Sequence, residues 1–96
     1  MSPNNKVRLN ILRNKLDKLD NDLLKIIKKR LNLVNEVLKV KVFKKEIVDK
    51  QRINQILKKI KNKSIKNKID HKITNRIWSN MIWSFIDYER RKFKKK

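Results

Sequence analysis

The sequence predicts an all-helical protein, and three observations support this. Glycine is absent, the only proline is Pro3, and β-branched residues nowhere alternate with polar ones over a long stretch. Turns and strands depend on those residues and on that alternation, so the 96-residue chain has little with which to build either. We therefore expect a single helical domain over residues 1–96, made of three helices and ending in a basic tail, residues 90–96.

The first predicted helix is long and carries one row of apolar side chains. Ser2 offers a cap, with Pro3 in the first turn. Steps of three and four residues meet apolar side chains everywhere except at Arg30. A helix from about Asn5 to Lys41 is roughly 55 Å long, against roughly 30 Å for a compact domain of this size. Much of the row therefore needs a partner, most simply in a two-fold homodimer. The row consists of Leu9, Leu12, Leu16, Leu19, Leu23, Ile26, Arg30, Leu33, Val37 and Val40.

Two shorter helices are expected to follow. Asp49 is the predicted cap of the second, whose apolar positions end at Ile60. Residues 61–68, KNKSIKNK, are polar and unperiodic, so we interpret them as a connection. Asp70 is the predicted cap of the third helix, whose apolar row ends in an acidic residue. The row consists of Ile73, Ile77, Trp78, Met81, Ile82, Phe85 and Glu89.

Charged residues interrupt these apolar rows. Arg30 and Lys41 are eleven residues apart, which places them on one helix face and roughly 16 Å from each other. A buried cation needs an anionic partner, either a protein carboxylate or a ligand. Glu89 is the opposite case, because a buried carboxyl either pairs with a cation or keeps its proton. These positions are the first candidates for a binding site.

Two further arginines are candidates for the same site. Arg13 lies seventeen residues before Arg30, so one straight helix cannot bring both to one small ligand. In a two-fold dimer, Arg13 of the partner subunit would come within reach of Arg30. Arg52 follows Asp49 by one turn, and this pair is either a cap with a first-turn ion pair or part of the pocket. We assign no chemical role to His71, Trp83 or Tyr88.

Composition excludes several kinds of chemistry. The absence of cysteine excludes disulfides, zinc–thiolate sites and a cysteine nucleophile, and a single histidine excludes a histidine-rich metal site. There is no glycine-rich phosphate loop and no nucleophile beside a base. The first ten residues lack a signal-like apolar run, and 18 apolar residues never occur together. We expect a soluble, cytoplasmic protein with no membrane partner.

The net charge of +20 suggests a nucleic-acid partner, but the composition weakens that inference. Lysine, asparagine and isoleucine are in excess while glycine and alanine are absent, a bias that an AT-rich genome would itself produce. Arg30 also lies in the apolar row, and Lys41 lies on the same helix face, so neither is on a separate exposed basic face. Nucleic acid is therefore not the partner that we expect.

Several short motifs occur in a fixed order along the chain. They are Leu12-Arg13, Leu19-Asp20, Arg30, Lys39-Val40-Lys41, IVDKQR at residues 47–52 and IWSNMIWSFIDYE at residues 77–89. Over about residues 9–93 this order resembles the AroQ-type, all-helical chorismate mutases. The resemblance implies an intertwined homodimer of three-helix protomers. It also implies conversion of chorismate to prephenate, toward phenylalanine and tyrosine, without cofactor or metal.

The resemblance also implies roles for individual residues. Arg30 and Arg52, with Arg13 of the partner subunit, would bind the two carboxylates of chorismate. Lys41 and Glu89 would flank the ether oxygen of its enolpyruvyl group. Because the rearrangement is unimolecular, it needs no base or nucleophile, only orientation and stabilisation of the charge that grows on that oxygen.

Three positions depart from the family pattern. Ile53 replaces a glutamate that contacts the ring hydroxyl, Phe85 replaces a serine near a carboxylate, and Glu89 replaces a glutamine. We expect Asp49, Ile53 and Phe85 to line the site. The alternatives are an isochorismate pyruvate lyase of the same fold, a basic nucleic-acid-binding dimer, and a dimer that has lost its activity.

Overall fold

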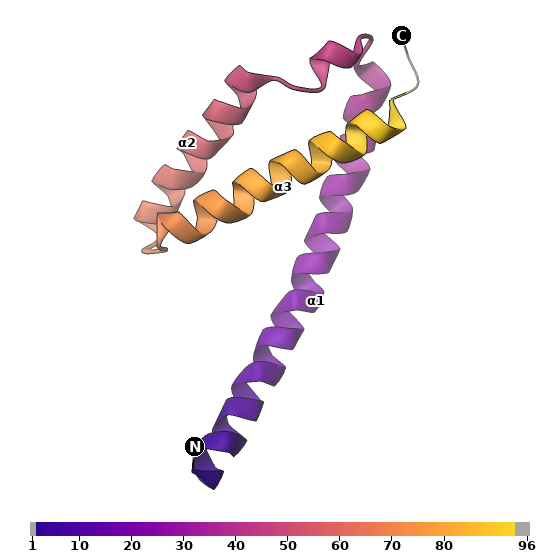
Figure 1. Cartoon of the computed structure of the whole chain (residues 1–96). Helices are drawn as coiled ribbons and strands as arrows, with labels where there is room; N and C mark the ends of the chain where they lie inside the picture. Colours follow the sequence, from indigo (N-terminus) through magenta and orange to yellow (C-terminus); the bar gives the residue numbers. More distant parts are fainter. Residues whose placement is uncertain (1, 94–96) are drawn as a thin grey trace. The chain divides into compact units, whose positions relative to one another are not determined.

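The computed structural model describes residues 2–93 and contains three α-helices and one short 3-10 helix (Figure 1). The elements are α1 (Pro3–Val40), η1 (Lys44–Glu46), α2 (Lys50–Lys66) and α3 (His71–Lys92). No strand occurs within residues 2–93, which confirms the all-helical prediction. The chain divides into two units, Met1–Leu33 and Val34–Lys96, each described below by itself.

The first unit consists of α1 up to Leu33. Its cap is the predicted one, because Ser2 Oγ accepts a hydrogen bond from the backbone N–H of Asn5 at 3.2 Å. The apolar row is exposed, with Leu19 at 61% and Leu23 at 53% of their full accessible area. This confirms that much of the row is not buried within one chain.

The second unit contains the end of α1, η1 and the hairpin formed by α2 and α3. The two helices pack against each other, and residues 67–70 join them (Figure 1). Ile47 follows η1 and is buried with Ile82 and Ile86 of α3. Five half-buried apolar side chains pack around these three: Val48, Ile53, Ile56, Leu57 and Phe93.

Both predicted caps in this unit are confirmed. Asp49 Oδ1 accepts from the backbone N–H of Arg52 at 2.9 Å, and Asp70 Oδ1 accepts from that of Lys72 at 2.9 Å. A carboxylate at this position satisfies one of the backbone donors that a helix leaves open at its start. The first turns of α2 and α3 are therefore fixed by the residues that immediately precede them.

The predicted end of α2 is wrong, because the helix continues beyond Ile60 to Lys66. Ser64 faces α3 and is buried. The packed face of α2 therefore continues through a polar residue, beyond Ile60, where its apolar pattern ends. The helix then closes at Lys68, which has a left-handed φ of 58°. The N–H of Ile69 donates to the Ser64 carbonyl at 2.9 Å, a helix-ending bond that usually accompanies glycine.

The packed face of α3 also differs from the predicted row. Ile73 and Ile77 of the predicted apolar row are 56% and 52% exposed, while Thr74 and Ile86, which lie outside that row, are buried. The predicted basic tail begins in the last turn of α3, and its residues 94–96 lie outside the described residues. Within the described range, no helix combines the length and the apolar character needed to cross a membrane.

Candidate active site

The structure brings Lys41 and Glu89 together. Lys41 follows the last residue of α1. Its backbone N–H still donates to the Val37 carbonyl at 3.2 Å, so its side chain continues the helical spacing of α1. Glu89 lies near the end of α3 and is buried. The Nζ of Lys41 is 3.2 Å from Oε1 of Glu89, with the side chains 18% and 8% exposed. Of the two alternatives for Glu89, pairing with a cation is the one observed.

A buried ion pair is a costly way to hold two helices together. Removing both charges from water cancels much of their attraction, and an apolar pair of similar volume is often as stable. The Lys41 ammonium carries three donors, and the Glu89 carboxylate accepts one of them. This arrangement holds an oriented cation that can donate further hydrogen bonds to an anionic ligand.

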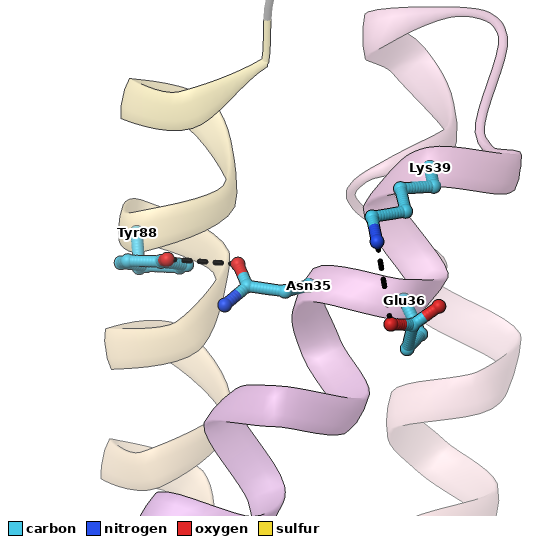
Figure 2. A network of polar contacts seen from close by, with 4 residues as sticks. All are labelled: Asn35, Glu36, Lys39 and Tyr88. Atoms are coloured by element: carbon cyan, nitrogen blue, oxygen red, sulfur yellow. Dashed lines mark hydrogen bonds and ion pairs between the residues drawn. The ribbon is translucent and has the colours of Figure 1, made fainter.

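A second polar contact connects the same two segments. The hydroxyl of Tyr88, the neighbour of Glu89, donates to Oδ1 of Asn35 at 2.8 Å. Figure 2 shows this bond on one side of α1 and the Glu36–Lys39 pair on the other. Sequence reasoning assigned a role to neither Tyr88 nor Asn35, because the partners are 53 residues apart and no periodic pattern connects them.

The remaining candidates of this unit lie on α2 and α3. Asp49 and Arg52 are exposed at the start of α2, and the cap is confirmed as the bond that joins them. Ile53 is half-buried against the isoleucine core, and Phe85 is half-buried on α3, one turn before Glu89. Their contacts with a ligand stay predictions.

Arg13 and Arg30 belong to the first unit. Arg13 is exposed and Arg30 is half-buried. Their part in binding carboxylates stays a prediction. Residues 2–93 hold no group of three His, Cys, Asp or Glu side chains arranged for a metal ion.

Comparison with known proteins identifies the class. The profile of the chorismate mutase type II family matches residues 12–90, which include most of α1, all of α2 and nearly all of α3. The chain therefore belongs to the chorismate mutase type II family, and the AroQ-type resemblance is confirmed. Searches of curated proteins and of solved structures gave no significant match.

Proposed function

We propose that this protein is a chorismate mutase that converts chorismate to prephenate, on the route to phenylalanine and tyrosine. Family membership supports the class of reaction. The part-buried Lys41–Glu89 ion pair is the observation that supports assigning the reaction to particular atoms. The family match extends across both units of the chain, which supports treating residues 1–96 as one functional domain.

The reaction is an intramolecular Claisen rearrangement. The ether C–O bond breaks while a C–C bond forms within the same molecule, and no proton is transferred. Negative charge grows on the ether oxygen as the bond breaks. The Lys41 ammonium donates to that oxygen, a contact that is stronger in the transition state than in the ground state and so accelerates the reaction.

Glu89 has two uses in this mechanism. As a carboxylate it holds the Lys41 ammonium in place, which is the contact observed at 3.2 Å. When its carboxyl carries a proton it donates to the ether oxygen beside Lys41. A glutamine at this position would supply the second function as well, because its amide always has a donor.

The substrate is a dianion, and the proposal assigns its carboxylates to arginines. Arg30 and Arg52 bind them together with Arg13 of the partner subunit. Planar guanidinium groups fit carboxylates through paired hydrogen bonds. Ile53 and Phe85 present apolar surface to the substrate ring, and Asp49 fixes the turn that carries Arg52.

The proposed protein is a homodimer with two sites shared between subunits. The exposed apolar row of α1 supports this assembly, because leucines in water gain stability when a second copy covers them. Mixing Arg13→Ala with Arg30→Ala protein under subunit exchange should restore part of the activity, since each heterodimer then has one intact site. Absence of recovery in verified heterodimers would exclude shared sites.

Product identification tests the proposed reaction against its nearest alternative. Purified protein is incubated separately with chorismate and with isochorismate, and the products are separated by chromatography. We expect prephenate from chorismate and no release of pyruvate from isochorismate. Pyruvate from isochorismate, with no prephenate, would instead support an isochorismate pyruvate lyase, which Ile53 and Phe85 make worth testing.

A further inference from the structure

We propose that the hydrogen bond between Tyr88 and Asn35 positions the Lys41–Glu89 pair for catalysis. Tyr88 and Asn35 are then positioning residues, because they act through the pair and do not touch the substrate. This inference rests on the proposed function. It states that kcat depends on Tyr88 and Asn35 as well as on the residues that touch the substrate.

The two polar contacts join the same segments of the chain. Tyr88 and Glu89 are consecutive on α3, while Asn35 and Lys41 lie six residues apart in the last part of α1 and just beyond it. Tyr88 Oη is 2.8 Å from Asn35 Oδ1, and Lys41 Nζ is 3.2 Å from Glu89 Oε1. None of the four residues is fully exposed, so water competes less for these bonds than at the surface.

The lysine contact alone restrains α3 weakly. The Lys41 stem has four rotatable bonds, so its ammonium can follow the carboxylate through small rotations of α3 about its axis. Consecutive residues of an α-helix point about 100° apart, so a second bond at Tyr88 restrains the rotation from another direction. Tyrosine and asparagine side chains have few rotatable bonds. Their hydrogen bond therefore restricts the rotation of α3 more than the Lys41–Glu89 contact does.

The tyrosine is itself held in place. The Arg91 guanidinium and the Lys92 ammonium each lie 6.0 Å from the centroid of its ring. Arg91 also pairs with Asp87, whose Oδ2 accepts a hydrogen bond from Nε at 3.1 Å. Cations near an aromatic face attract it, which favours this orientation of the ring. Electrostatic stabilisation of a transition state depends on such prior orientation.

The test removes the hydroxyl while keeping the ring. We expect Tyr88→Phe to lower kcat roughly three- to tenfold, the equivalent of about one neutral hydrogen bond, with little change in KM because the arginines remain. Asn35→Leu should have a similar effect. Asn35→Asp keeps an acceptor oxygen for Tyr88 and should therefore keep most of the wild-type kcat. Glu36→Gln is the matched control, since it alters the neighbouring exposed pair with Lys39 and should leave kcat unchanged.

A double-mutant cycle separates positioning from general stability. If Tyr88 acts through Glu89, Tyr88→Phe should cost nothing further in a Glu89→Ala background, or in a Lys41→Met background should the first fail to fold. An equal loss of kcat in every background, or no loss in the wild type, would overturn the inference.

The same proteins keep this inference separate from the proposed function. Wild-type protein inactive on chorismate would contradict the function, and the cycle would then be measured by the free energy of unfolding. A clear coupling between Tyr88→Phe and Glu89→Ala supports positioning of the pair by Tyr88. Strict additivity contradicts it.

Discussion

Two polar pairs, one buried and one part-buried, lie at opposite ends of α3, and they differ in charge. Near the start, the hydroxyls of Ser64 and Thr74 are hydrogen-bonded to each other at 2.7 Å. Ser64 Oγ also donates to the Ile60 carbonyl at 2.6 Å, so helix backbone satisfies the pair locally. Near the other end, Lys41 and Glu89 carry full charges at 3.2 Å. The neutral pair closes the hairpin, and the charged pair is suited to a ligand.

The two pairs differ in the free energy needed to bury them and in their ability to bind a ligand. Burial of a hydroxyl is cheap once it is hydrogen-bonded, and two neighbouring hydroxyls fit between α2 and α3 without unsatisfied atoms. Burial of a charge costs several kcal/mol, which its partner recovers only in part. We therefore expect changes at Ser64 and Thr74 to affect stability, and changes at Lys41 and Glu89 to affect activity.

Apart from Lys41 itself, the largest effect is expected at Glu89. Glu89→Ala removes the acceptor that orients Lys41, and kcat should fall by one to two orders of magnitude, because hydrogen bonds to charged groups contribute about 1.5 to 3 kcal/mol. Glu89→Gln should keep substantial turnover, because its amide oxygen can still accept from Lys41 and its amide N–H can donate to the ether oxygen. A folded but inactive Glu89→Gln protein would remove Glu89 from the donor role.

An intermediate effect is expected at the neutral pair. Thr74→Val should lower the free energy of unfolding by about 0.5 to 1.5 kcal/mol, measured by urea titration, with kcat unchanged. The double variant Ser64→Ala/Thr74→Val should lose less than the sum of the single variants, because no hydroxyl is left without its partner. If kcat fell by more than the fraction of folded protein, Ser64 and Thr74 would affect activity directly. That result would contradict the assignment of stability to one end of α3 and activity to the other.

The smallest effect is expected at the turn beside the neutral pair. Lys68 adopts a left-handed conformation with φ 58°, which costs a residue with a Cβ about 1 kcal/mol. Lys68→Gly should therefore raise the free energy of unfolding by up to about 1 kcal/mol, offset in part by the greater freedom of glycine in the unfolded chain. Lys66→Gly, inside the last turn of α2, is the control and should lower it. Equal effects of the two changes would contradict the assigned helix end.

The predictable parts of the fold are those set by neighbours in the sequence. Ser2, Asp49 and Asp70 were identified as caps because a cap acts on residues two or three positions ahead. Lys41 and Glu89 stood out for a different reason, since each is a charged side chain within an apolar pattern. Their pairing required the fold, because 48 residues separate them.

The parts that sequence reasoning missed depend on tertiary packing. The last turns of α2 look polar, and only contact with Thr74 shows that Ser64 is part of a packed face. A lysine in place of glycine at position 68 concealed the true end of the helix. Tyr88 and Asn35 carry no local signal at all. The carboxylate-binding roles of Arg13, Arg30 and Arg52 stay predictions.

The central claim is that Lys41 stabilises the charge that develops as chorismate rearranges. The most direct measurement is the loss of chorismate absorbance with wild-type and Lys41→Met protein at equal concentration, with helical content checked by circular dichroism. We predict measurable turnover by the wild type and a loss of roughly 10²- to 10³-fold in kcat for the folded variant, the effect of removing a donor to a developing oxyanion. A folded Lys41→Met protein that turns over chorismate at the wild-type rate would contradict the account.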